Sequence, residues 1–256
     1  MSSQDPIRLR FAASAPLMAE QTASGARALG DRVARFARME GTERVLDAGT
    51  GTGTLALGLA PHAGDVVGVD FVPELLVEAR RLARGSENVS FVEADVLALP
   101  FERESFDLAA SSRTLHHVGR PGLLISELTR VARPGGRVLL IDQLASHDPL
   151  ESMAHDRIER LRDPSHTRTL SDQDIRSLLD ANSLVLDRSE TSREERDLDR
   201  FLDLGACHGP PREAVLQEVE RLVERGDRAG IDLRRTPTGY AMTVSVGLYL
   251  ATKPTA

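Results

Sequence analysis

The sequence predicts an α/β fold in which helices cover both faces of a doubly wound, mostly parallel sheet. Between residues 41 and 142, short runs rich in Val, Leu and Ala alternate with stretches of helical periodicity, and this alternation is typical of a parallel sheet. Two expected helices begin with Pro73 and Pro121, which the first helical turn accepts because the missing N–H would have no partner there. The expected strands are residues 44–48, 65–70, 89–93, 106–111 and 137–142. The expected helices between them are residues 54–60, 73–84 and 121–132.

The rest of the chain departs from this alternation. Residues 149–162 have apolar residues at helical spacing. Ser171, with Asp174 three residues later, predicts an acidic capping box that opens a helix over 171–182. The two helical insertions are too small to fold alone, so we interpret the chain as a single domain over residues 1–256. Its expected parts are N-terminal helices in 1–40, a ligand-binding core in 41–142, helical cap insertions at 143–168 and 195–235, and a last strand at 241–251.

Composition narrows the class of protein. No apolar run reaches the roughly 18 residues that span a bilayer, and the first ten residues lack the apolar stretch of a secretory signal. The one cysteine, Cys207, cannot form an internal disulfide, which favours a cytoplasmic protein. The formal charge of −7 and the aromatic content of 4% disfavour a nucleic-acid partner, because phosphate binding needs a basic surface and base stacking needs aromatic rings.

The most specific local pattern is the loop over residues 47–53, which reads Asp-Ala-Gly-Thr-Gly-Thr-Gly. Glycines let a backbone turn sharply after a strand and approach a ligand without a Cβ in the way. The dinucleotide pattern Gly-x-Gly-x-x-Gly fails here, because the sixth position counted from Gly49 is Thr54. A carboxylate at Asp47 would repel a pyrophosphate and attract an ammonium group. Taken alone, the loop could equally be a tight turn.

Two further carboxylates follow neighbouring strands. Asp70 ends the second expected strand and Asp95 comes just after the third, and ligands in open α/β sheets bind outside the carboxyl ends of the strands. Asp70 could accept from both hydroxyls of a ribose, and Asp95 from an adenine amino group, with the backbone at Val96 at the ring edge. Each could equally cap a surface turn. With Asp47 they suggest a nucleoside that carries an ammonium group and no phosphate, as S-adenosylmethionine does.

Five segments together resemble class I S-adenosylmethionine-dependent methyltransferases. They look most like the branch that contains ubiquinone/menaquinone C-methyltransferases and many natural-product methyltransferases. The resemblance covers residues 41–142 firmly and 143–256 loosely. The segments are Val-Leu-Asp-Ala-Gly-Thr-Gly-Thr-Gly (45–53), Val-Val-Gly-Val-Asp (66–70), Glu-Ala-Asp-Val-Leu-Ala-Leu-Pro-Phe (93–101), Phe-Asp-Leu-Ala-Ala-Ser-Ser-Arg-Thr-Leu-His-His-Val (106–118) and Arg-Pro-Gly-Gly-Arg-Val-Leu-Leu (133–140).

The resemblance implies a Rossmann-like sheet of seven strands with an antiparallel last strand. It also implies S-adenosyl-L-methionine as the methyl donor and S-adenosyl-L-homocysteine as the product. The donor-binding residues that it implies are Asp47, Gly49, Gly51 and Gly53 for the methionine portion, Asp70 for the ribose, Phe71 against the adenine face, Asp95 and Val96 for the adenine, and Ser111 and Ser112 on the sulfonium side.

Catalytic residues are harder to assign. Methyl transfer from a sulfonium is an in-line displacement, so alignment supplies much of the rate, and a base is needed only when the nucleophile must lose a proton. We expect one of His116 and His117 to face the methyl group and the other to face away, and the family pattern favours His117. His166 and Asp163 lie in an Asp-Pro-Ser-His segment expected to cover the donor. Each could equally be structural. No zinc-binding helix and no thiolate cluster indicates a metal site.

The expected function is methyl transfer to an O, N or C nucleophile of a small, quinone-like or other natural-product metabolite, with the insertions as a lid. The alternatives are a family member that binds S-adenosylmethionine for a non-methylating reaction, and a protein or RNA methyltransferase. The insertions could instead pack on the sheet or form a homodimer interface. The apolar residues expected to wall the acceptor site are Leu150, Met153, Ile158, Leu161, Leu216, Val219, Leu222 and Val223.

Overall fold

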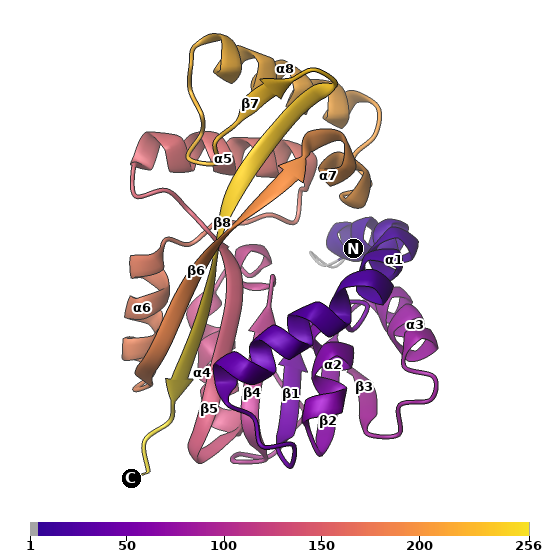
Figure 1. Ribbon diagram of the computed structural model, residues 1–256, viewed down its shortest axis with the longest axis vertical. Helices are drawn as coiled ribbons and strands as arrows, with labels where there is room; N and C mark the ends of the chain where they lie inside the picture. Colours follow the sequence, from indigo (N-terminus) through magenta and orange to yellow (C-terminus); the bar gives the residue numbers. More distant parts are fainter. Residues whose placement is uncertain (1–4, 256) are drawn as a thin grey trace.

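The computed structural model describes residues 5–255 (Figure 1). Residues 1–4 and 256 of the predicted domain lie outside the described residues. The predicted α/β class is confirmed: one sheet holds eight described strands, in the order β3-β2-β1-β4-β5-β8-β6, with β7 paired to β8. Within residues 5–255, no helix is both long and apolar enough to cross a bilayer.

The parallel half of the sheet sets the position of the site. Its strands are β1 (Arg44–Ala48), β2 (Asp65–Asp70), β3 (Val89–Glu93), β4 (Phe106–Ser112) and β5 (Ala132–Leu144). β1 pairs with β2 on one side and with β4 on the other, all parallel. The strand order therefore reverses between β1 and β4, and the carboxyl ends of these strands share one edge, where open α/β sheets bind ligands.

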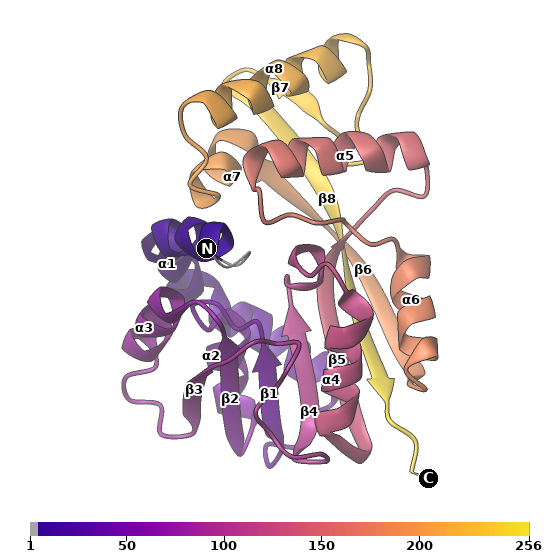
Figure 2. The same cartoon turned by 180° about the vertical axis from the view of Figure 1, so that it is seen from behind.

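Helices cover both faces of this half (Figures 1 and 2). Helix α1 (Asp5–Ala37) is one helix of 33 residues, where several N-terminal helices were expected. It packs on α2 (Thr54–Leu59) so closely that a Cβ on Gly30 would lie 1.9 Å from the carbonyl oxygen of Gly58. α3 (Pro73–Leu82) packs beside α1, while α4 (Pro121–Val131) and α6 (Asp172–Ala181) lie on the opposite face. The predicted capping box opens α6, with both of its hydrogen bonds present.

The antiparallel half is longer than the sequence indicated. β8 (Gly239–Thr252) runs antiparallel to both β5 and β6 (Val185–Asp197), which confirms the antiparallel last strand. The expected insertion at 195–235 starts inside β6 and ends inside β7 (Arg234–Thr236). The sequence predicts a strand over residues 184–188, but the full length of β6 was hard to recognise because it is a largely exposed edge strand with a charged sequence.

A cap surrounds the C-terminal end of β6 and the N-terminal end of β8 (Figure 1). It consists of α5 (Pro149–Arg162), α7 (Leu198–Leu204), α8 (Pro210–Glu224) and β7. Ile158, Val219 and Leu222 are buried in the core that these helices share with β8. Leu150 and Met153, in contrast, are 75% and 65% exposed, so they do not pack in this core, and their place in the wall of the acceptor site stays a prediction.

Candidate active site

The glycine loop after β1 has the conformation that glycine favours. Gly49, Gly51 and Gly53 have φ angles of 78°, 55° and 88°, a region that residues with a Cβ rarely adopt. A Cβ on Gly49 would lie 2.2 Å from Oγ1 of Thr114, so the loop packs directly against the segment after β4. A Cβ on Gly51 would meet only Met18 of α1, at 3.6 Å. The loop therefore packs tightly against the segment after β4 at Gly49 and more loosely against α1 at Gly51.

Asp47 is a buried carboxylate with one oxygen in use. Its Oδ2 accepts hydrogen bonds from Oγ1 of Thr50 at 2.6 Å and from the backbone N–H of Ala56 at 3.1 Å. Its Oδ1 is buried and has no hydrogen-bond partner among the described residues. Burial, with the nearby charge of Asp70, raises the pKa of Asp47 to about 6. A buried acceptor without a partner is unfavourable, and a ligand donor would remove that cost.

Asp70 ties the loop to the end of β2. Its two oxygens accept from the backbone N–H groups of Gly51 at 2.9 Å and Val72 at 3.0 Å, and burial raises its pKa. Each carboxylate oxygen has a second lone pair that a ribose hydroxyl could use. Asp95 accepts from the backbone N–H of Leu97 at 2.9 Å, one strand further along the same edge.

Helix α1 closes over this edge, a contribution that our sequence analysis missed. Phe11 and Met18 pack with Phe71 against the buried Val72. Thr22 lies 2.7 Å from Thr52 in the glycine loop, measured between the two Oγ1 atoms. The apolar spacing within α1 predicts a helix with one buried face, but nothing in the local sequence indicates that this face packs on the glycine loop.

The histidines form one cluster beside this edge. His116 and His117 lie on the 3-10 helix η2 (Leu115–His117), and their ring centroids are 4.1 Å apart. His116 Nδ1 is 2.6 Å from Asp142 Oδ1 at the end of β5, and the His166 ring is 5.8 Å from that of His116. The expectation that one of the adjacent pair faces away is therefore wrong, because the short turn directs both rings into the same cluster.

His117 contacts the segment that follows α5. Its Nδ1 is 2.9 Å from Oγ of Ser165, and Ser165 Oγ is 2.5 Å from Oδ1 of Asp163. The Asp163 side chain is fully buried, and its Oδ2 lies 2.6 Å from the guanidinium of Arg10 on α1. The structure thus places the buried Asp163 carboxylate between Ser165 and Arg10. Neither Arg10 nor Ser165 was predicted as a site residue.

His166 holds the same segment against α5. Its side chain is fully buried, and its Nε2 lies 2.8 Å from Oδ1 of Asp156. Its Nδ1 is buried without a hydrogen-bond partner among the described residues. Among residues 5–255, no group of His, Cys, Asp and Glu side chains is arranged to hold a metal ion.

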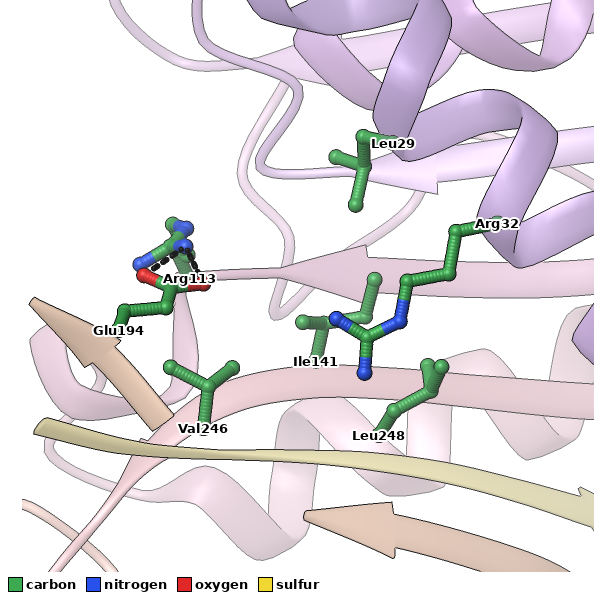
Figure 3. A pocket seen from close by; sticks show the side chains of 7 residues that line it. All are labelled: Leu29, Arg32, Arg113, Ile141, Glu194, Val246 and Leu248. Atoms are coloured by element: carbon green, nitrogen blue, oxygen red, sulfur yellow. Dashed lines mark hydrogen bonds and ion pairs between the residues drawn. The ribbon is translucent and has the colours of Figure 1, made fainter. Parts of the chain in front are cut away.

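Two surface pockets lie along α1. The first has an empty volume of about 310 Å³, and in it Arg32 faces the ion pair of Arg113 and Glu194 across an apolar floor (Figure 3). The second, of about 470 Å³, lies between α1 and α7. Neither is lined by the glycine loop or by the histidines, since α1 and the cap close over that edge.

Comparisons with known proteins decide the family. A family described as a methyltransferase domain matches residues 46–140. The uncharacterized methyltransferase YcgJ of Bacillus subtilis is 31% identical over 197 residues, which cover 76% of this chain and 77% of that protein. The chain belongs to the methyltransferase family. This methyltransferase is an S-adenosylmethionine-dependent enzyme, as the resemblance of its glycine loop and strand ends implied.

Other relatives match more narrowly or share the fold. The demethylmenaquinone methyltransferase of Clavibacter sepedonicus is 36% identical over 129 residues, 50% of this chain and 53% of that protein. The matched part of this chain thus spans about half the length of that relative. The crystal structure of YcgJ from Bacillus subtilis superposes with a TM-score of 0.82 at 25% identity, covering 90% of this chain and 99% of that one. The [4+2]-cyclase SpnF has a TM-score of 0.64 at 22% identity, over 90% of this chain and 85% of that one, which shows the fold alone.

The residues at this edge fit the donor. S-adenosylmethionine carries an ammonium group, which the unpartnered Oδ1 of Asp47 could accept. It carries no phosphate, which the buried carboxylates of Asp47 and Asp70 would repel.

Proposed function

We propose that this methyltransferase transfers a methyl group from S-adenosylmethionine to an O, N or C nucleophile of a small-molecule metabolite, quinone-like or another natural product. The observation that carries the proposal is the buried, unpartnered Oδ1 of Asp47 two residues before the glycine loop. The relatives named demethylmenaquinone methyltransferase support a quinone-like acceptor. The free, buried Cys207 suits a reducing compartment, and we propose that the protein is cytoplasmic.

The proposed donor site lies at the edge where the carboxyl ends of the parallel strands meet. Bound S-adenosylmethionine supplies the methyl group as a sulfonium, and the residues around it need only hold and align it. Asp47 would accept from its ammonium group and Asp70 from its ribose hydroxyls. The other assigned residues are Gly49, Gly51 and Gly53 beside the methionine portion, Phe71, Asp95 and Val96 around the adenine, and Ser111 and Ser112 on the sulfonium side.

The acceptor would bind beside the histidine cluster. His117 is half-buried while His116 and His166 are buried, so His117 is the group of the cluster best placed to meet a small molecule. His116 is held by Asp142 and His166 by Asp156, and we assign both to shaping the site. The cap would cover the site, and α1 with the segment 163–170 would close over the strand ends and exclude water from the reaction.

A non-methylating reaction is the second candidate. The cyclase SpnF has this fold, so the fold of this chain does not by itself establish methyl transfer. A protein or RNA substrate is less favoured, since the formal charge of the chain is −7 and RNA binding needs a basic surface.

Methyl-labelled S-adenosylmethionine tests the proposal. The protein is incubated with the labelled donor and with a panel of quinols, phenols and fractionated metabolite extracts, with Asp47→Ala as the control. We expect label in a small molecule only with the unchanged protein. In parallel, calorimetry should show binding of S-adenosylhomocysteine and none of NAD. Micromolar NAD binding without a response to S-adenosylmethionine would contradict the assignment of the donor site.

A further inference from the structure

Three side chains from two separate segments of the chain form a chain of hydrogen bonds that ends at His117. Oγ of Ser165 is 2.5 Å from Oδ1 of Asp163 and 2.9 Å from Nδ1 of His117. The backbone N–H of Ser165 donates to the same Oδ1 at 2.9 Å. Ser165 therefore lies between a buried carboxylate and a histidine ring.

The direction of each hydrogen bond follows from the protons available. A serine hydroxyl has one proton and a carboxylate has none, so Ser165 donates to Asp163 and must accept from Nδ1 of His117. In a neutral imidazole only one nitrogen carries a proton. The ring proton of His117 is therefore on Nδ1, and Nε2 carries a lone pair.

Neighbouring contacts fix this arrangement. The guanidinium of Arg10 pairs with the other oxygen of Asp163 at 2.6 Å, so the carboxylate is held from two sides. Thr167 donates to the carbonyl oxygen of His116 through its N–H at 2.8 Å and its Oγ1 at 2.9 Å. The segment with Ser165 is thus anchored to the turn that carries His117, which leaves the hydroxyl little freedom to turn elsewhere.

We propose that Ser165 is a positioning residue that holds His117 in the Nδ1–H tautomer, so that Nε2 accepts a proton from an acceptor O–H or N–H group during methyl transfer. This inference rests on the proposed function, since it takes the acceptor to bind beside His117. It narrows the acceptor to molecules whose nucleophilic atom bears a removable proton. Asp163 acts through Ser165, and Arg10 acts through Asp163.

The reaction breaks the bond between the acceptor atom and its proton and the C–S bond of the donor. The acceptor atom loses its proton to Nε2 and uses its electron pair to bond the methyl carbon. The electron pair of the broken C–S bond stays on sulfur, and S-adenosylhomocysteine results. Burial and the neighbouring His116 and Arg10 lower the pKa of His117 well below its usual value of 6.5, so the ring is neutral at pH 7 and its lone pair is available.

Nitrogen-15 NMR of histidine-labelled protein tests the tautomer without requiring any activity. His117→Gln identifies the signals of His117 by their loss. In the unchanged protein with S-adenosylhomocysteine bound, we expect a protonated Nδ1 and an unprotonated Nε2. Ser165→Ala should shift the ring toward the Nε2–H tautomer. Ser165→Thr, which keeps the hydroxyl, should retain Nδ1–H, and Ser177→Ala on the exposed surface of α6 should change nothing.

Kinetics with a labelled acceptor then test the use of this tautomer. General-base catalysis contributes roughly 10²–10⁴-fold, so His117→Gln should lower kcat by about 100-fold or more. Ser165→Ala should lower kcat more than it raises KM, and Ser165→Thr should restore it. If Ser165→Ala fails to fold, Ser165→Cys replaces it, because a thiol of similar size accepts hydrogen bonds weakly.

The outcomes separate the two proposals. An Nε2–H tautomer in the unchanged protein, or an unaltered tautomer in the Ser165 variants, overturns the positioning role whatever the activity. A tautomer that changes as expected, in an enzyme whose kcat does not depend on His117, overturns the use of His117 as a base. Failure to methylate any acceptor, with the tautomer intact, contradicts the proposed function and leaves the hydrogen-bond assignment standing.

Discussion

Arg10 and Asp163 form a buried ion pair, with 2.6 Å between Nη2 and Oδ2 and with side chains that are 12% and 0% exposed. Arg10 lies in α1 and Asp163 directly follows α5. The pair therefore joins the N-terminal helix to the segment that carries Ser165 and His166. Burial lowers the pKa of Arg10 to about 10, so the guanidinium still carries its charge at neutral pH.

Breaking this pair should be costly. Asp163→Ala leaves the guanidinium of Arg10 buried without a partner, and removing one member of a buried ion pair typically costs about 3–5 kcal/mol. We expect a loss of that size in the free energy of unfolding, measured by urea denaturation. Asp203→Ala, which breaks a more exposed pair with Arg212, should cost less than about 1 kcal/mol. Equal effects of the two changes would show that the Arg10 pair contributes no more than a surface pair.

Asp47→Asn should stabilise the ligand-free protein while weakening donor binding. Burial raises the pKa of Asp47 from 3.8 to about 6, so the folded state binds a proton more tightly than the unfolded state. Wild-type stability is therefore lost as pH rises from about 4 to 6, by up to about 3 kcal/mol. The amide removes this loss, so its Tm should exceed that of the wild type at pH 8 and match it near pH 4.

The same change tests the role of Asp47 in binding. Affinity for S-adenosylmethionine in the wild type should rise as pH increases through 6, because the ionised carboxylate attracts the ammonium group. Asp47→Asn should abolish this rise, as measured by calorimetry, whereas Asp180→Asn on α6 should preserve it. A variant that binds the donor as tightly as the wild type at pH 8 would remove Asp47 from the donor site.

Asp70→Ala should weaken donor binding and also lower stability. Loss of hydrogen bonds to the ribose should cost about 1–3 kcal/mol of affinity. Asp70 also accepts from the backbone N–H groups of Gly51 and Val72. Leaving them without partners should cost a further loss of about 1–3 kcal/mol in unfolding free energy. Unchanged affinity combined with reduced stability would make Asp70 purely structural.

The pH profile of kcat should report on His117. Its lowered pKa predicts that activity falls only well below pH 6.5. The charged or titratable groups around it are His116 on the same turn, Arg10 on α1, Arg162 on α5, and His166 with Asp163 on the following segment. Arg10→Met removes a positive charge and should move the acid limb to higher pH, while Arg8→Met, at an exposed position, should not. If the acid limb of the kcat profile lies at the same pH in Arg10→Met as in the wild type, a group other than His117 controls it.

Hydrogen exchange should locate the mobile part of the site. The core of the cap packs on β8, so α5 and α8 should be protected with or without ligands. Residues 10–22 of α1 and the segment 163–170 should gain protection when S-adenosylhomocysteine and an acceptor bind, since they close over the strand ends. Equal protection of these segments in every state would contradict closure by α1.

The parallel core could be predicted from the amino-acid sequence alone. The bounds of β1, β2 and β3 match the predicted ranges. For β1 and β2, strands buried on both faces read as continuous apolar runs between turn residues. The capping box of Ser171 and Asp174 and the positions of the glycines after β1 are also local signals. Such features depend on residues a few positions apart, so a single sequence reveals them. The donor-site candidates follow, since parallel strands bring their carboxyl ends to one edge.

The contacts between residues far apart in the sequence could not be predicted and are known only from the folded structure. Arg10 has no local signature that points to Asp163, and Ser165 becomes informative only once His117 is seen beside it. Met153 and Ile158 both fit the apolar pattern of α5, yet one is exposed and the other buried, because the side on which α8 packs determines the buried face. The length of β6 was equally hidden in a charged sequence. A buried charge or an edge strand is stable only through partners remote in sequence, and the packing of the elements selects those partners.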